Sequence, residues 1–267
     1  MIPKIIHYCW FGNNEKPELV LRCIESWKKQ LPDWEIIEWN ESNWDVRNFE
    51  FTKKAYENKK YAFISDVARL DVLYRYGGVY LDTDVEILKM NPFDRFLQLD
   101  AFFSFENERN VNTGQCFGSM RRVNLINSLM ADYYTKEYSN KINDNINTYV
   151  NHKTFSDYGL KWTGKNQVIN NIMFISVGEF NEFAKHYGTR TWDIEQQSYT
   201  LNRGRYRDTK IKRILRNPKI FEIIENVFGD GKILKAYSFI AYDLLENGVI
   251  YFASRLFKRI NRKRSNR

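Results

Sequence analysis

The stretch 65–86 holds the residues best spaced for chemistry, and it reads SDVARLDVLYRYGGVYLDTDVE. Asp82 and Asp84 are separated by one residue, so in an extended segment both carboxylates face the same side. Asp66 and Arg69 are three residues apart, so on a helix they also share a face. Three carboxylates with one guanidinium suit a hard divalent cation that carries a phosphorylated ligand. The candidate catalytic residues are therefore Asp66, Arg69, Asp82 and Asp84.

The elements around this stretch are predicted to bring its charges together. We expect a helix from Ser65, as its N-cap, to Tyr76, where two glycines end it. A short apolar strand, 79–81, then leads into the two aspartates. An isolated D-x-D is often only a polar loop after a strand. The helix in front favours a cation site, because gathered carboxylates are unfavourable unless a cation neutralises them.

The chain before this stretch predicts a parallel sheet. Residues 2–10 read as a buried strand, 17–30 as a helix with an apolar stripe, and 34–39 as a second strand. This β-α-β order favours parallel strands joined by a right-handed crossover. The expected fold class is therefore α/β.

The remaining elements are predicted from shorter patterns. The expected helices are 49–60, 123–138 and 166–174, the expected strands are 101–105 and one within 111–120, and 183–192 is short strand and loop. Residues 139–164 are polar, rich in asparagine and poorly periodic, which indicates a surface excursion. These patterns indicate a catalytic domain of residues 1–205 and a mostly helical, basic C-terminal extension of residues 206–267.

Composition places the chain among soluble globular proteins. Its 267 residues are 43% hydrophobic and 16% aromatic, which is enough for a substantial core. Three cysteines, without metal-ligand spacing, argue against a disulfide framework and favour a reducing compartment. We see no signal peptide, and the longest apolar stretch, 236–257, is interrupted by Asp243, Glu246 and Asn247. We therefore expect a soluble, cytoplasmic protein.

Positive charge is concentrated towards the C-terminal end. From Arg203 onward, 17 Lys and Arg stand against 6 Asp and Glu, whereas the whole chain has a net charge of +8. Residues 249–267 have a basic amphipathic pattern, which suits either an anionic membrane surface or packing on the protein's own domain. Charge alone also permits nucleic acid binding. We recognise no nucleic-acid motif, however, so no nucleic acid partner is expected.

The run S-D-x-x-R…G-G-x-Y-x-D-x-D, from Ser65 to Asp84, resembles the core of glycosyltransferase family 32. This family of DXD-containing sugar transferases includes enzymes of capsular polysaccharide synthesis and yeast α-mannosyltransferases. The opening I-P-K-I-I-H-Y-C-W-F-G and the late segment H-Y-G-T-R-T-W, 186–192, fit the same family, so the resemblance covers roughly the first 195 residues. Two positions depart from it: Lys165 follows Thr-Gly where relatives often carry proline, and Thr191 stands where serine is usual.

The resemblance implies a GT-A-type, Rossmann-like fold that binds a nucleotide-sugar donor together with Mn2+ or Mg2+. It makes Asp84 a direct metal ligand, lets Asp82 reach the metal and the ribose, and lets His186 complete the metal shell. It places Asp66 and Arg69 at the sugar hydroxyls and the phosphate side of the donor. The remaining donor contacts that it implies are Tyr80 near the nucleotide, Trp10 stacked on the base and Trp192 close to the diphosphate.

The implied reaction transfers a hexosyl group, with retention of anomeric configuration, to a glycan or lipid-linked acceptor in surface polysaccharide biosynthesis. Diphosphate leaves readily only when its charge is neutralised, which a divalent cation and Arg69 would do. Retaining enzymes of this fold have no agreed nucleophile, so we name none. Asp66 and Asp71 are the carboxylates to test, and Asp71 is expected to be solvated or ion-paired. Of the other histidines, His7 is expected in the core, and His152, in the polar excursion, is expected to be exposed.

Two other functions remain open at this point. The D-T-D-V run also matches the nucleophile motif of haloacid-dehalogenase phosphatases, with Asp82 as nucleophile and 228–232 as a weak echo of their late lysine. The strand before Asp82 is short for that fold, and Asp66 and Arg69 would have no role in it. The second alternative is a non-enzymatic nucleic-acid binder that acts through the basic tail.

Overall fold

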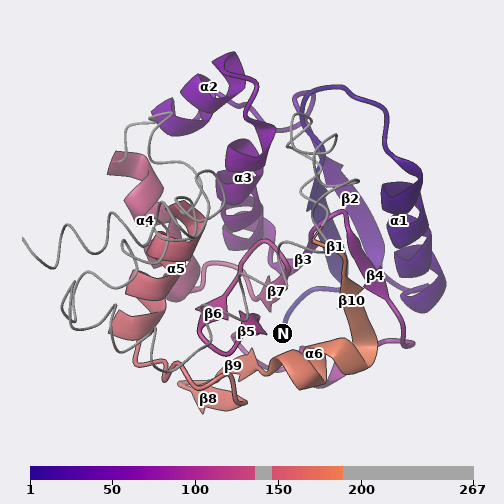
Figure 1. Ribbon diagram of the computed structural model, residues 1–267, viewed down its shortest axis with the longest axis vertical. Helices are drawn as coiled ribbons and strands as arrows, with labels where there is room; N and C mark the ends of the chain where they lie inside the picture. The colour runs from indigo at the N-terminus through magenta and orange to yellow at the C-terminus, as the bar shows by residue number, and fades with distance from the viewer. Residues whose placement is uncertain (136–145, 189–267) are drawn as a thin grey trace, which may run out of the picture. The chain divides into compact units, whose positions relative to one another are not determined.

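The computed structural model describes residues 1–135 and 146–188, and these form a mixed α/β unit (Figure 1). Its eight-stranded sheet has the order β2-β1-β3-β7-β5-β9-β8, with β6 paired to β5. The strands of this sheet are β1 Ile5–Cys9, β2 Glu35–Trp39, β3 Gly78–Leu81, β5 Ala101–Asn107, β6 Asn110–Val111, β7 Cys116–Ser119, β8 Gln167–Ile169 and β9 Ile172–Ile175. A separate ribbon pairs β4 Val85–Ile87 with β10 Ala184–His186.

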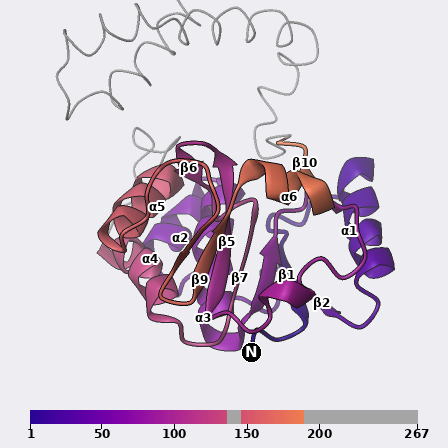
Figure 2. The same ribbon diagram turned by 90° about the horizontal axis from the view of Figure 1, so that it is seen from below.

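Helices cover both faces of the sheet. They are α1 Glu18–Gln30, α2 Glu50–Glu57, α3 Tyr61–Tyr76, α4 Asn124–Thr135, α5 Ile146–Asp157 and α6 Val177–Phe183, with a short 3-10 helix at Asp94–Phe96. Figure 2 shows α1 on one side of the sheet and α3, α4 and α5 on the other. Each side has its own cluster of buried apolar side chains. The α/β fold class expected from the sequence is confirmed.

Strand directions explain where the candidate site forms. The central strand β1 pairs in parallel with both β2 and β3, as the β-α-β pattern predicted. The carboxyl ends of these three strands therefore lie at one edge of the sheet, and residue 82 leaves β3 at that edge. Beyond β3 the neighbouring strand β7 runs antiparallel, which changes the sheet from parallel to mixed.

Three local predictions were wrong, each for a physical reason. Ser65 is not a helix cap: α3 begins at Tyr61, and the Ser65 hydroxyl donates to the Tyr61 carbonyl at 3.3 Å inside the helix. Residues 166–174 form the β8–β9 hairpin, because Asn170 and Asn171 adopt positive φ angles of 46° and 61° and make the tight turn.

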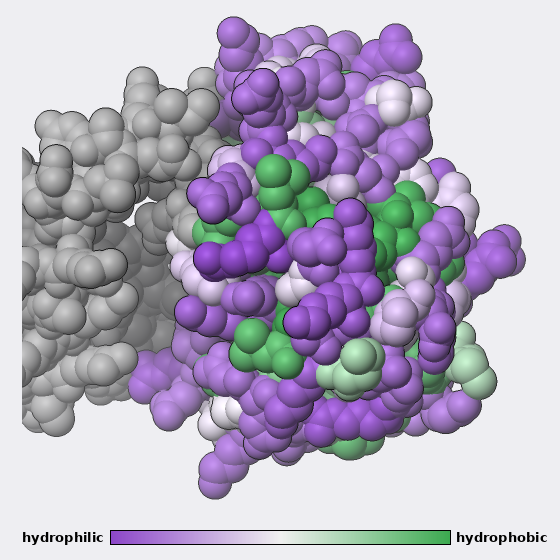
Figure 3. All heavy atoms as spheres, turned by 90° about the vertical axis from the view of Figure 1, so that its right-hand side faces the viewer, coloured by the Kyte–Doolittle hydropathy of each residue, from purple (hydrophilic) through white to green (hydrophobic). Residues whose placement is uncertain are grey.

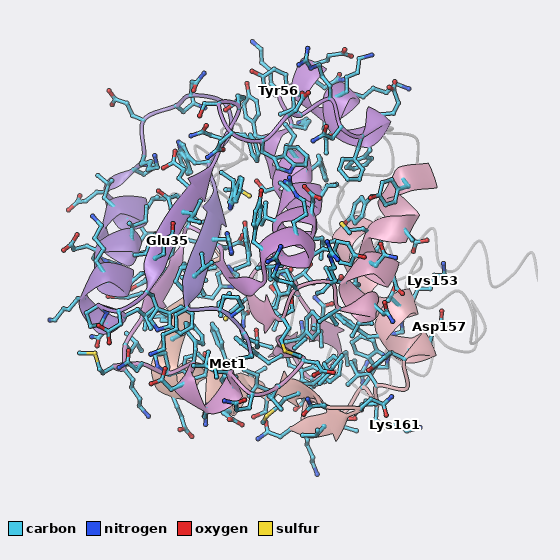
Figure 4. All side chains as sticks on the ribbon, turned by 180° about the vertical axis from the view of Figure 1, so that it is seen from behind. Met1, Glu35, Tyr56, Lys153, Asp157 and Lys161 are labelled. Carbon is cyan, nitrogen blue, oxygen red and sulfur yellow. The ribbon has the colours of Figure 1, made fainter. Side chains whose placement is uncertain are left out.

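The third correction concerns 139–164, which was predicted to be a surface excursion but contains helix α5. Its inner face carries polar as well as apolar side chains, since Asn151 and Thr154 are buried beside Val150 and Phe155. That mixture hides the apolar periodicity by which a helix is recognised. On the outer face Lys153 and Asp157 point away from the sheet (Figure 4).

The face on the α1 side of the unit is mostly hydrophilic with separate hydrophobic patches (Figure 3). In the described part of the chain, no helix is long and apolar enough to cross a membrane. The three cysteines are free and buried. The predicted extension 206–267, its basic segment 249–267, and Trp192 and Thr191 lie outside the described residues.

Candidate active site

A glycine turn places the DXD segment. Helix α3 ends at Tyr76 and Gly77 follows as its C-cap, with φ of 68°, and β3 starts directly at Gly78, with φ of 108°. Residues that carry a side chain rarely adopt such positive φ angles. A Cβ on Gly78 would lie 2.7 Å from the Ile5 carbonyl oxygen and 2.8 Å from His7 Nε2. All four residues of β3 are buried, so the strand fixes the direction in which Asp82 leaves it.

Asp82, Asp84 and His186 form a compact set of metal-ligand atoms, all within 4.8 Å of one another. His186 Nε2 lies 3.2 Å from Asp84 Oδ1. The Asp84 and His186 side chains are only 9% and 17% exposed, whereas that of Asp82 is 30% exposed and opens the site to solvent. Two carboxylate oxygens and one imidazole nitrogen are common ligands of divalent cations, so these three residues fit such an ion.

His186 reaches this place through the β4–β10 ribbon. The ribbon is antiparallel, with His186 opposite Val85, the residue that follows Asp84. The structure therefore brings His186 to Asp82 and Asp84, as the resemblance implied and as the spacing along the sequence could not show.

Arg69 links the helix to the DXD segment. Its Nη2 donates to Asp66 Oδ1 at 2.5 Å and its Nε donates to the Ser65 carbonyl at 2.8 Å. The remaining nitrogen, Nη1, is buried, has no hydrogen-bond partner among the described residues and lies 3.7 Å from Asp82 Oδ1. A buried guanidinium nitrogen without an acceptor is costly, so this group is suited to an anionic or hydroxyl-bearing ligand.

The charges of the site perturb one another. Burial, with the neighbouring charge of Asp84 added, raises the pKa of Asp82 to about 6, although Arg69 opposes the shift. Burial lowers the pKa of His186, but its hydrogen bond to Asp84 and the charges of Asp84 and Asp82 outweigh this and leave that pKa raised. Burial likewise acts against the charge on Arg69, yet nearby Tyr80, Asp66 and Asp82 leave its pKa raised. The site thus holds excess negative charge that a cation would neutralise.

Tyr80 is a buried residue of β3 that holds the Asp82 carboxylate by a hydrogen bond. It is 1% exposed, its hydroxyl donates to Asp82 Oδ1 at 3.0 Å, and the Arg69 guanidinium lies 5.0 Å from its ring centre. Because its ring is enclosed, Tyr80 reaches the site through its hydroxyl rather than through a free ring face.

Trp10 lies at the same edge of the sheet but in a separate set of contacts. Its backbone N–H donates to the Trp39 carbonyl at 2.9 Å, which continues the β1–β2 pairing. Its indole Nε1 donates to the Asn14 carbonyl at 2.7 Å, and Lys16 Nζ lies 5.7 Å from its ring centre. The ring is partly exposed, as stacking on a base would require, and no contact described here joins it to Asp82.

The loop 112–115 is part of the site but was given no role from the sequence. Asp82 N–H donates to the Gln115 carbonyl at 3.3 Å. A Cβ on Gly114 would lie 2.6 Å from Arg69 Nη1, 2.9 Å from Asn112 Oδ1 and 3.0 Å from Asp82 Oδ2. Only a glycine leaves this wall of the site open. The only sign of this loop in the sequence is the N-T-G run, 112–114, which precedes a predicted strand.

The other titratable residues singled out from the sequence have structural roles. Asp71 accepts from Trp44 Nε1 at 2.8 Å and pairs with Arg75 at 2.7 Å, which confirms the predicted ion pair. His7 is fully buried, also as predicted. His152 is only half-buried and stacks on Trp162 with ring centres 4.2 Å apart, so the expectation of a merely exposed histidine was wrong.

Comparisons with known proteins place the chain among glycosyltransferases. The family model described as the glycosyltransferase sugar-binding region containing the DXD motif matches residues 17–102. An uncharacterised glycosyltransferase of Acanthamoeba polyphaga mimivirus is 30% identical over 185 residues, which are 66% of this chain and 71% of that protein.

Two relatives from Schizosaccharomyces pombe match over a shorter length. Inositol phosphoceramide mannosyltransferases 1 and 3 are 32% and 38% identical over 108 and 90 residues, or 38% and 32% of this chain. The matched parts are 33% and 24% of those two proteins, so the chain spans a third of their length or less.

Two solved structures are similar at low identity. The PaToxG glycosyltransferase matches with a TM-score of 0.47 and 16% identity, over 58% of this chain and 68% of that one. A glycosyltransferase involved in glycosylation of the major capsid of PBCV-1 matches with a TM-score of 0.39 and 12% identity, over 74% and 100%.

The matched region of the family model contains both the Asp66–Arg69 pair and the DXD segment, and the viral relative extends the similarity over two thirds of the chain. The protein therefore belongs to the family of glycosyltransferases whose sugar-binding region contains a DXD motif.

Proposed function

We propose that this glycosyltransferase moves a hexosyl group from a nucleotide-sugar donor in a reaction that depends on a divalent cation. The observation that carries the proposal is the set of ligand atoms on Asp82, Asp84 and His186, within 4.8 Å of one another and beside Arg69 Nη1, which is ion-paired with Asp82 but makes no hydrogen bond among the described residues. Carboxylate oxygens favour Mn2+ or Mg2+ over softer metals, and Mn2+ accepts an imidazole as well.

Each residue has a role that follows from its contacts. When bound, the cation supplies neutralisation of the diphosphate leaving group. Arg69 offers the open hydrogen-bonding capacity of Nη1 to the phosphate or a sugar hydroxyl, while Asp66 and Ser65 hold its other nitrogens. Tyr80 orients Asp82 through its hydroxyl. Trp10 provides an aromatic face for the base.

We infer retention of anomeric configuration. The bond from the anomeric carbon to the diphosphate oxygen breaks, and a bond to the acceptor oxygen forms on the same face. The acceptor proton passes to the departing phosphate oxygen. No described side chain is assigned as a nucleophile or base.

The acceptor that we propose is a glycan or a lipid-linked glycan in surface polysaccharide biosynthesis. Two relatives are named inositol phosphoceramide mannosyltransferases, which makes mannose the first donor sugar to test. Segment 249–267 is proposed to contact an anionic membrane at its inner face, because its charge and apolar pattern suit such a surface.

The two alternative functions, a haloacid-dehalogenase phosphatase and a nucleic-acid binder, gain no support from the part of the chain that the structure describes. The family is one of glycosyltransferases, and Arg69, which a phosphatase would leave without a role, pairs with both Asp66 and Asp82. The 228–232 echo and the basic tail invoked for a nucleic-acid binder lie outside the described residues.

The proposal is tested with a panel of UDP- and GDP-sugars, each with and without Mn2+ or Mg2+. We expect one donor to raise the Tm only when the metal is present, because a ligand that binds the folded state stabilises it by mass action. Metal-dependent hydrolysis of that donor should be lost in Asp84→Asn.

Asp33→Asn is the matched control, since it makes the same chemical change at an exposed position. It should bind and hydrolyse the donor like the wild type. If Asp84→Asn kept full metal-dependent turnover, or if donors bound equally well in the presence of EDTA, the proposed metal site would be wrong.

A further inference from the structure

The strand that carries His186 is too short to hold it in place alone. The strands β4 and β10 have three residues each, and an isolated two-stranded ribbon of this length is marginal in water. His186 therefore needs other contacts if it is to stand beside Asp84 before a ligand arrives.

Strand β4 itself is fixed from the α1 side. Trp27 Nε1 donates to the Val85 carbonyl at 2.7 Å, and Ile87 N–H donates to Ser26 Oγ at 3.0 Å. Val85 and Ile87 are buried, so Glu86 between them faces the other side of the strand, and Asp84 stands in the turn directly before Val85. Glu86 is thus a fixed point two residues from a metal ligand.

Tyr187, the residue after His186, attaches β10 to that fixed strand. Its backbone N–H donates to the carbonyl oxygen of Asp84 at 3.0 Å, and its hydroxyl donates to Glu86 Oε2 at 2.6 Å. Two cations flank its ring: the Arg22 guanidinium at 5.2 Å and Lys185 Nζ at 4.4 Å from the ring centre. Such cation–π contacts favour one position of the ring.

These contacts enclose His186 between two fixed points. The residue before it, Lys185, pairs with Glu86 in the ladder, and the residue after it bonds to Asp84. We propose that Tyr187 is a positioning residue of the metal site, which holds His186 against Asp84 through its bonds to Asp84 and Glu86. The inference rests on the proposed metal dependence, and it adds that cation affinity is set in part by the Tyr187–Glu86 hydrogen bond.

The test is direct titration of Mn2+ into the full-length protein by calorimetry, for the wild type, Tyr187→Phe, Glu86→Gln and the double variant. Partners that orient metal ligands typically change metal affinity by tenfold or more, so each single variant should raise the Kd for Mn2+ about tenfold. The double variant should be no weaker than the singles, because both remove one shared hydrogen bond. In these variants, donor turnover should recover as the Mn2+ concentration is raised. The substitutions would then change the KM for the metal and leave kcat unchanged.

Tyr134→Phe is the matched control, because it removes the same hydroxyl from an exposed tyrosine of α4. It should leave the Kd for Mn2+ unchanged. If Tyr187→Phe lowers the Tm too far for titration, Glu86→Gln tests the same bond from the acceptor side.

The outcomes separate the two proposals. Wild-type protein that binds Mn2+, with an unchanged Kd in both Tyr187→Phe and Glu86→Gln, would overturn the role of Tyr187 and leave the metal site standing. Wild-type protein that binds no Mn2+ would overturn the metal dependence and the role of Tyr187 with it.

Discussion

His7 Nε2 donates a hydrogen bond of 2.8 Å to the carbonyl oxygen of Gly77, so the first strand of the sheet holds the turn that starts β3. The other ring nitrogen, Nδ1, accepts from Trp39 Nε1 at 3.0 Å. Because a carbonyl can only accept and an indole N–H can only donate, these partners require the neutral imidazole with its proton on Nε2. The position of the DXD segment therefore depends on a histidine that must stay uncharged.

The first prediction is that stability falls in mild acid because of His7. Burial lowers the pKa of His7 to about 4, below its ordinary value of 6.5, so as pH falls the unfolded chain takes up the proton first. The contribution of His7 is complete above pH 6.5 and is lost as pH falls towards 4, by up to about 3 kcal/mol.

Urea unfolding between pH 7.5 and pH 4.5 measures this loss in the wild type and in His7→Gln. The variant keeps an amide donor for Gly77 but cannot be protonated, so its free energy of unfolding should depend less on pH. Equal pH dependence in the two proteins would show that His7 does not carry the effect.

The second prediction concerns Arg69, whose guanidinium donates to Ser65 and Asp66 while Nη1 faces Asp82 at 3.7 Å without a hydrogen bond. An ammonium cannot make this set of contacts, so Arg69→Lys should lower kcat/KM for the donor by about a hundredfold.

Arg75→Lys is the control in the same helix, because the Arg75 side chain is 42% exposed and pairs with Asp71 rather than with the DXD segment. Its kcat/KM should stay within about twofold of the wild type, since exposed ion pairs contribute little. A loss of similar size in both variants would point to a general effect on α3 rather than to the site.

The sequence shows those parts of the site in which local spacing determines geometry. Asp66 and Arg69 share a face because they lie three residues apart on a helix. The expectation that Asp82 and Asp84 share a face of an extended segment was wrong: they stand in the turn between β3 and β4, where Val85 N–H donates to the Asp82 carbonyl at 3.0 Å. His186 depends on pairing between strands far apart in the sequence, which no local pattern encodes, so only the family resemblance indicated it.

The errors have the same origin. Asn151 is polar yet buried, because its Nδ2 donates to the Val111 carbonyl at 3.1 Å, and this tertiary bond makes the inner face of α5 look solvent-exposed in the sequence. The hairpin at 166–174 was missed although Asn170-Asn171 is a common tight-turn pair. Helix α5 is therefore stabilised by tertiary contacts that local sequence propensity does not reveal.

The third prediction follows from this bond. Asn151→Leu should leave the Val111 carbonyl without its side-chain donor and lower the free energy of unfolding by about 1–3 kcal/mol. Urea unfolding measures the change. Asp157→Ala, on the exposed face of the same helix, should change it by no more than about 0.5 kcal/mol. Equal effects of the two substitutions would contradict a specific role for Asn151.

The last prediction tests the loop that the sequence left without a role. Gly114→Ala places a methyl group 2.6 Å from Arg69 Nη1 and 3.0 Å from Asp82 Oδ2, in the space that a donor would share with both groups. We expect donor turnover to fall by about a hundredfold or more, because small misplacements at a reacting centre cost that much. Gly178→Ala, where the nearest atom would be 4.0 Å away, is the control and should retain wild-type turnover. Wild-type donor affinity and turnover in Gly114→Ala would show that this loop does not border the donor.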